Sequence, residues 1–170
     1  MYSNYSKRSK AAGFSEPAAL SDSELRVAAI NLLSRREYSR HELFQKLESR
    51  CKNELQLDQL LDYLTQSGYQ SDERFAESFL RSRINRGLGR LRIERELKDK
   101  GIKKELIEQV LSGDTDWFLQ AYESGLKKSQ SLNLTDYKEK QKLYRYLAYR
   151  GFSMAEIQCA VEQYLELSSL

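Results

Sequence analysis

Near the middle of the chain the sequence reads Gly89-Arg90-Leu91-Arg92-Ile93-Glu94-Arg95-Glu96-Leu97-Lys98-Asp99-Lys100-Gly101-Ile102, in which apolar residues recur at helical spacing between two glycines. With the period of an α-helix, Ile93 and Leu97 share one face and are expected to point inward. Gly101 follows where a helix commonly ends in the left-handed conformation, which glycine adopts without a Cβ clash. The stretch therefore predicts a short helix with one buried face and a glycine stop.

The same pattern occurs 50 residues earlier and 50 residues later. This offset superposes Leu43, Ile93 and Leu143, then Leu47, Leu97 and Leu147, and then Arg50, Lys100 and Arg150. Gly151 and Phe152 repeat the turn at Gly101, whereas the first copy has Cys51 and Lys52 there and lacks the glycine. Units of this length bury their apolar faces by stacking on their neighbours. We therefore expect an all-α protein, a tandem array of three three-helix repeats that is elongated and curved and presents a long surface.

Apolar residues at helical intervals continue along the rest of the chain. They predict nine helices near residues 23–34, 40–51, 55–67, 72–86, 89–100, 103–112, 115–128, 137–150 and 154–167. Three Ser-x-x-Glu capping boxes, at Ser21–Glu24, Ser39–Glu42 and Ser153–Glu156, mark helix starts. The domains predicted from these signals are a mobile N-terminal tail over 1–19, then three-helix repeats over 20–70, 71–113 and 114–170.

Composition excludes several classes of protein. The chain of 170 residues is 40% hydrophobic and 31% charged, which is typical of a compact soluble protein. No apolar run approaches the roughly 20 residues of a membrane helix, and the first residues lack the apolar stretch of a secretory signal. We therefore expect a cytoplasmic protein with no membrane partner.

Catalytic or metal-binding residues form no recognisable pattern. Cys51 and Cys159 lie far apart and His41 is the single histidine, so the spacing of zinc ligands is absent. No carboxylate pair has environments that predict opposed acid and base roles, and no nucleophile has a plausible base. We therefore expect a binding protein without enzymatic activity, cofactor or metal.

Positive charge is concentrated in the centre of the chain. The net charge is +3, but residues 81–104 carry ten Lys and Arg against three acidic residues. The cations predicted to bind a polyanion or an acidic partner are Arg81, Arg86, Arg90, Arg92, Arg95, Lys98, Lys103 and Lys104. Arg92, Arg95 and Lys98 lie away from the predicted buried face, in a row that suits phosphates or carboxylates. The alternative is a solvated face, because Asp99 can pair with Arg95 across one turn.

Arg83 is expected to behave differently, because its position falls within the apolar face of its helix. A buried guanidinium needs a partner, and Glu96 on the next helix is the candidate carboxylate. We interpret this pair, together with the turn glycines Gly101 and Gly151, as structural.

The third repeat offers a second candidate binding surface. Lys140, Arg145 and Arg150 alternate there with tyrosines, on which nucleic-acid bases could stack beside phosphate-binding cations. Tyrosines at helical spacing are also common core residues, so packing is the alternative interpretation.

Taken together, these residues resemble the RecX family of bacterial regulatory proteins. The pattern consists of Gly68-Tyr69, Asp72, Arg74, Phe75, Ala76, Arg83, Gly89, Arg92-Ile93, Glu96-Leu97, Gly101-Ile102, Leu147 and Arg150-Gly151-Phe152. It covers roughly residues 20–167 and fixes the spacing across a helix, a turn and the next helix. Gln70 and Ser71 depart from it, because the family tends there to an apolar residue and an Asp or Asn.

The resemblance implies a non-enzymatic modulator of the RecA recombinase. Such a protein binds the RecA filament on single-stranded DNA, lodges in its helical groove and limits recombinase, ATPase and coprotease activity. It thereby modulates DNA repair, recombination and the SOS response. We expect a monomer, with single- and double-stranded DNA as further partners. Two alternatives stay open, a helical DNA-binding protein that acts without RecA and a repeat scaffold for an unrelated partner.

Overall fold

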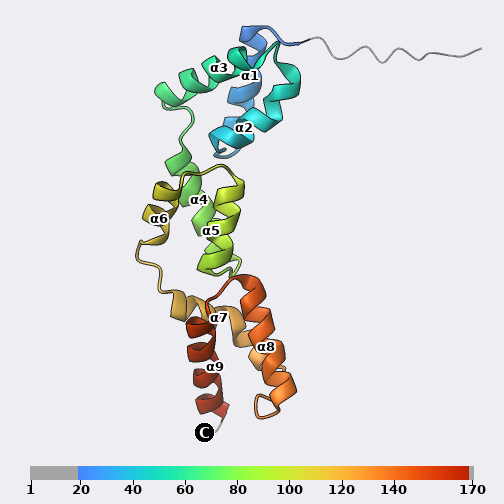
Figure 1. Cartoon of the computed structure of the whole chain (residues 1–170), viewed down its shortest axis with the longest axis vertical. Helices are drawn as coiled ribbons and strands as arrows, with labels where there is room; N and C mark the ends of the chain where they lie inside the picture. The colour runs from blue at the N-terminus through green and yellow to red at the C-terminus, as the bar shows by residue number, and fades with distance from the viewer. Residues whose placement is uncertain (1–18, 169–170) are drawn as a thin grey trace, which may run out of the picture.

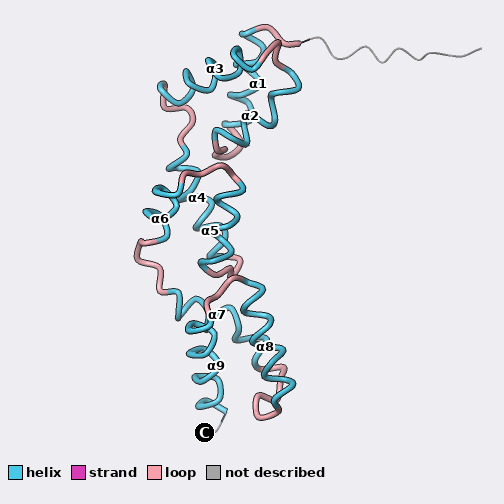
Figure 2. The backbone as a smooth tube through the Cα atoms, viewed as in Figure 1, coloured by secondary structure: helices cyan, strands magenta, loops and turns pink. Residues whose placement is uncertain are grey.

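The computed structural model describes residues 19–168, which form nine α-helices, one 3₁₀-helix and no strand (Figure 2). The elements are α1 (Asp22–Leu33), α2 (Arg40–Leu47), η1 (Glu48–Arg50), α3 (Glu54–Gln66), α4 (Asp72–Asn85), α5 (Arg90–Asp99), α6 (Lys104–Leu111), α7 (Trp117–Ser129), α8 (Tyr137–Arg150) and α9 (Met154–Ser168). The prediction of an all-α chain is confirmed. The predicted mobile tail falls largely on residues 1–18, which lie outside the described residues. No helix in the described part of the chain is long and apolar enough to span a membrane.

The helices form three groups of three along an elongated, curved array (Figure 1). We call α1–α3 the first unit, α4–α6 the second and α7–α9 the third. Three separate apolar clusters follow this grouping, although Trp117 at the start of α7 packs into the cluster of the second unit. Leu43, Ile93 and Leu143, which the 50-residue offset superposes, are each fully buried in their own cluster. Residues that the predicted repeat places at equivalent positions therefore also pack at equivalent positions in the three units.

Serine side chains begin the helices as predicted, with one exception. At Ser21 and Ser153 both halves of the capping box form, because the glutamate three residues later accepts from the serine N–H. Ser39 accepts from the Glu42 N–H at 3.1 Å, but the Glu42 carboxylate does not reach back. It turns to cations instead, so the second predicted capping box is only half formed.

Glycines end α5 and α8 in equivalent turns. Gly101 has φ 74° and Gly151 has φ 93°, in the left-handed region that glycine tolerates. The following residues close both turns, since the N–H of Ile102 donates to the Leu97 carbonyl (3.1 Å) and the N–H of Phe152 to the Leu147 carbonyl (3.2 Å). The first unit lacks this glycine, and there α2 ends early and continues as η1.

The middle helices α2, α5 and α8 follow one another end to end (Figure 1). The N–H of Gly89 donates to the Arg150 carbonyl at 2.8 Å, so the start of α5 meets the end of α8. The Ser39 hydroxyl likewise donates to the Lys100 carbonyl at 2.8 Å, so the start of α2 meets the end of α5. Orphan carbonyls at each helix end are thus satisfied by the preceding unit, and the helix dipoles align head to tail.

Candidate binding surface

The ten cations of residues 81–104 divide into paired and unpaired groups. Six form ion pairs, which are Arg81–Glu77, Arg83–Glu96, Arg92–Glu96, Lys98–Glu94, Lys100–Glu42 and Lys104–Glu108. Three of the carboxylates, on Glu42, Glu77 and Glu108, come from outside this segment. The segment is therefore less positive in the fold than in the sequence.

Arg83 and Arg92 share one carboxylate. Arg83 Nε lies 2.6 Å from Glu96 Oε2, the partner expected from the sequence, and its guanidinium stacks 4.0 Å from the centroid of the Phe79 ring. Arg92 Nε lies 2.9 Å from Glu96 Oε1, and its Nη1 donates to the Tyr149 carbonyl of the third unit at 3.3 Å. Arg92, a predicted binding residue, thus contributes to the contact between the second and third units.

Two carboxylates each hold two cations: Glu42 pairs with Arg36 of its own unit and Lys100 of the second, and Glu96 with Arg83 and Arg92 of the second unit, of which Arg92 also reaches the third. Burial raises the pKa of Glu96, but the hydrogen bonds from Arg83 and Arg92 lower it by more than burial raises it. The pKa of Glu96 therefore lies below its ordinary value. The pKa of Glu42 is lowered by the same balance, in which the hydrogen bonds from Arg36 and Lys100 outweigh burial. Both groups are therefore ionised at neutral pH.

Acid is expected to weaken these junctions. The pKa of Glu42 and of Glu96 is lower in the folded chain than in the unfolded chain, where it is about 4.3. Their ionised carboxylates therefore contribute fully to the free energy of unfolding above about pH 4.3, and this contribution is lost as the pH falls through their pKa in the folded chain. Urea unfolding should therefore show the free energy of unfolding decreasing below about pH 4.5. Glu96→Gln should be about 1–2 kcal/mol less stable at neutral pH, since Arg83 and Arg92 lose their charged partner, and its decrease in acid should be smaller. An unchanged acid dependence in this variant would show that Glu96 does not hold the junction.

Two further predicted binding residues also make contacts inside the array. Arg150 Nη1 donates to the carbonyls of Arg86 (2.7 Å) and Gly87 (3.0 Å) in the second unit. Arg90 is half-buried, and its Nη1 donates to the Leu111 carbonyl at 3.3 Å. These guanidinium groups connect helices, so they are poorly placed to reach a partner.

Arg95, Lys103 and Arg145 are three exposed cations that stay available. Within residues 19–168 their side chains form no hydrogen bond or ion pair, and the Arg95–Asp99 pair weighed as an alternative is absent. Arg145 stands 50 residues after Arg95, so the two occupy equivalent positions on α5 and α8. Among the other candidates, Arg86 is likewise exposed and its side chain forms no ion pair within the described residues, Lys140 is half-buried, and Lys98 lies 2.5 Å from Glu94.

Comparison with known proteins identifies the family. Models described as the first, second and third three-helix domains of RecX match residues 26–64, 71–111 and 114–161. The chain belongs to the RecX family. Regulatory protein RecX of Acinetobacter baylyi is 42% identical over 146 residues, which are 86% of this chain and 91% of the relative. That of Legionella pneumophila is 42% identical over 126 residues, 74% of this chain and 84% of the relative.

Solved RecX structures have the same fold. The crystal structure of RecX from Lactobacillus salivarius superposes with a TM-score of 0.72 at 27% identity, covering 86% of this chain and 97% of that one. The junction at Gly89 and Gly151 joins the second RecX domain to the third. Residues that carry the RecX resemblance, among them Arg92 and Glu96, lie at this junction, which explains why their spacing spans a turn.

Two exposed side chains lie beside the cations: Leu91, which was not singled out from the sequence, and Tyr149, which is one of the third-unit tyrosines considered for base stacking. Leu91 is 55% exposed and its N–H donates to the Gly151 carbonyl, so it lies at the junction of the second and third RecX domains. Tyr149, 77% exposed, places its ring 5.2 Å from Arg92 Cζ. Leu91 could have been found, because it is apolar and lies off the face of Ile93 and Leu97. No group of potential metal ligands occurs in the described part of the chain.

Proposed function

We propose that this protein binds the RecA filament on single-stranded DNA in the bacterial cytoplasm and restrains its ATPase, recombinase and coprotease activities. The family supports a regulatory role, because the relatives are named regulatory proteins. We infer the contact site from one observation, that Arg95 and Arg145 stand at equivalent positions of the repeat and are both exposed and unpaired among the described residues. A groove-binding protein needs charges repeated along its length, and collinear helices supply them.

The proposed contact runs along α5 and α8 and includes Lys103, the residue that precedes α6. Arg95, Lys103 and Arg145 would meet phosphates or acidic side chains, because their heads are solvated and free to reorient. Leu91 and Tyr149 would add the apolar and aromatic anchors that dominate binding energy in many interfaces. Arg92 and Arg150 would support this surface by fixing the second unit against the third.

RecA's ATP hydrolysis on single-stranded DNA, titrated with substoichiometric amounts of the protein, tests the proposal. Combined Arg95→Glu and Arg145→Glu changes should raise the concentration for half-inhibition by at least about tenfold, equivalent to about 1.4 kcal/mol. Arg92 is left intact, because a glutamate there would face Glu96 and open the junction. Lys52→Glu with Lys127→Glu is the matched control, since both lysines are exposed and neither lies on α5 or α8.

Two results would refute the proposal. One is equal inhibition by both double variants at unchanged helicity. The other is binding to DNA without RecA that is as tight as filament binding and falls steeply with salt, which the independent DNA-binding protein predicts.

A further inference from the structure

The first unit carries an open groove at the N-terminal end of the array. It measures about 670 Å³ and lies between α1 and the end of α2. Val27, Ala28, Asn31, Arg35, Leu47 and Arg50 are among its lining residues. This groove is separate from the α5–α8 surface assigned to RecA above.

The same groove occurs a second time, between the first and second units. That copy measures about 380 Å³, and its α4 residues stand 51 positions after those of α1. The matching pairs are Glu24 and Phe75, Val27 and Ser78, Ala28 and Phe79, Asn31 and Ser82, Leu32 and Arg83, and Arg35 and Arg86. Lys100 at the end of the middle helix takes the place of Arg50. The two grooves are therefore repeat equivalents.

The second copy is covered by the first unit. Arg36, Glu37 and Glu42 line it from the loop before α2 and from the first turn of that helix. The Glu42 carboxylate lies 2.8 Å from Lys100 Nζ. A helix start with an acidic side chain is thus the natural occupant of this groove.

The third unit is covered by the corresponding segment of the second, although α5 has no acidic residue in its first turn and the contacts go to backbone carbonyls. Gln120 and Ser124 of α7 donate to the carbonyls of Ile84 and Gly87, at 2.7 and 2.9 Å. Arg150, the equivalent of Lys100 and Arg50, also donates to Gly87. The second and third units therefore each receive the segment between the first and middle helices of the unit before them.

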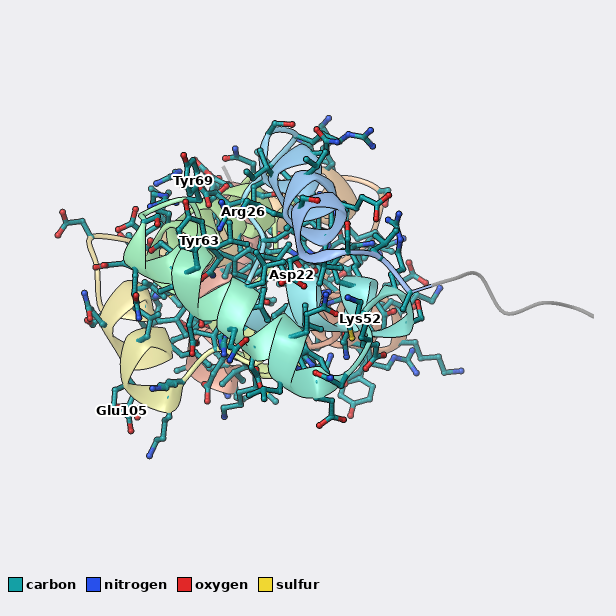
Figure 3. The ribbon with its side chains drawn as sticks, turned by 90° about the horizontal axis from the view of Figure 1, so that it is seen from above. Asp22, Arg26, Lys52, Tyr63, Tyr69 and Glu105 are labelled. Carbon is teal, nitrogen blue, oxygen red and sulfur yellow. The ribbon has the colours of Figure 1, made fainter. Side chains whose placement is uncertain are left out.

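In the part of the chain that the structure describes, no further helical unit precedes the first one, and the groove is covered there only by a backbone contact. The N–H of Leu20 donates to the Arg50 carbonyl at 2.8 Å, as Gly89 does to Arg150. In the described part of the chain, the side chains of Arg35, Lys46 and Arg50 form no ion pair, and Val27 is 57% exposed. The other side of α1 faces α3, where the Arg26 guanidinium lies 4.1 Å from the centroid of the Tyr63 ring (Figure 3) and leaves only a smaller pocket of about 170 Å³.

We propose that this groove docks the acidic first turn of a helix from a partner protein. A carboxylate would meet Arg50 as Glu42 meets Lys100, and apolar side chains would cover Val27 and Ala28. The chain's own residues 1–18 are a poor occupant by charge, since Lys7, Arg8 and Lys10 outnumber Glu16. Nucleic acid is disfavoured by the apolar floor of the groove.

A synthetic peptide tests the proposal against the full-length protein. The probe has the sequence of residues 36–47, the segment that covers the equivalent groove, with Arg40→Ala and Lys46→Ala to make it acidic. In ¹H–¹⁵N NMR spectra it should shift amides of α1 and the end of α2, with a dissociation constant of about 1 mM or tighter. Arg50→Glu should weaken binding by about tenfold or more, and a probe carrying Glu42→Lys should recover binding to that variant.

Three results would overturn it. One is no shift at about 5 mM peptide, well above a weak affinity. Another is shifts confined to the groove between the first and second units. The third is equal shifts at α1 from a single-stranded oligonucleotide, lost in Arg50→Glu, which would identify the groove as a nucleic-acid site.

Discussion

Gly151→Ala is expected to lower the unfolding temperature by about 6–12 °C, because two costs coincide at this residue. Its φ of 93° is left-handed, where a side chain costs about 1–2 kcal/mol. An added Cβ would also lie 2.5 Å from the Arg92 backbone nitrogen, and such overpacking costs about 1–3 kcal/mol. A total of about 3 kcal/mol, at about 2–4 °C per kcal/mol for a chain of this size, gives the expected shift.

Three other glycines separate these costs. Gly68 has φ 74° but nothing within 4 Å of an added Cβ, so Gly68→Ala reports the backbone cost alone. Gly89 has φ −88° but its Cβ would lie 2.4 Å from the Gly151 carbonyl oxygen, so Gly89→Ala reports the clash alone. Gly113→Ala meets only an ordinary contact at 3.6 Å and serves as the control.

In thermal melts followed by circular dichroism, the unfolding temperature should be highest for Gly113→Ala and lower for Gly68→Ala and Gly89→Ala. It should be lowest for Gly151→Ala. Small-angle scattering should show a changed shape only for the two variants at the junction, because only these push the second and third units apart. If Gly89→Ala has the same unfolding temperature as Gly113→Ala, the second and third units do not contact each other through Gly89 and Gly151.

Much of this fold follows from local signals. The positions of Ile93 and Leu97, repeated at an offset of 50, indicate both the helices and the stacking, because an amphipathic helix must bury its apolar face. The pairing of Arg83 with Glu96 followed from placing a guanidinium on an apolar face, where only a paired charge is stable. Such inferences need only one helix and its successor.

The contacts between units were harder to predict, because they depend on how the units stack. The periodicity of their own helices predicts that Arg92 and Arg150 are exposed cations. Their partner carbonyls belong to the neighbouring unit, which that periodicity does not describe. Glu42 stands in a capping-box pattern, but two cations outcompete the serine N–H for its carboxylate. Sequence periodicity within a helix carries no information on these choices.

Reversing the charge of Glu42 is expected to cost about 3 kcal/mol, because three cations would then meet at one buried position. The Glu42 side chain is only 9% exposed and lies between Arg36, at 2.9 Å, and Lys100, at 2.8 Å. A lysine there would lose both ion pairs and add a third positive charge, while the Ser39 cap on α2 stays in place. Arg36 and Lys100 reach water, which keeps the cost below that of a fully buried pair.

A charge swap distinguishes this electrostatic cause from a loss of packing. Lys100→Glu in the Glu42→Lys background restores an opposite pair across the junction, so urea unfolding should show a coupling free energy of about 1–2 kcal/mol. Glu123→Lys on α7 is the matched control and should change stability by less than about 0.5 kcal/mol, because Glu123 is exposed and has no ion pair in the described part of the chain. Costs that simply add in the double variant would mean that Glu42 acts by filling space, and the first two units would then be joined by packing and backbone contacts instead of charge.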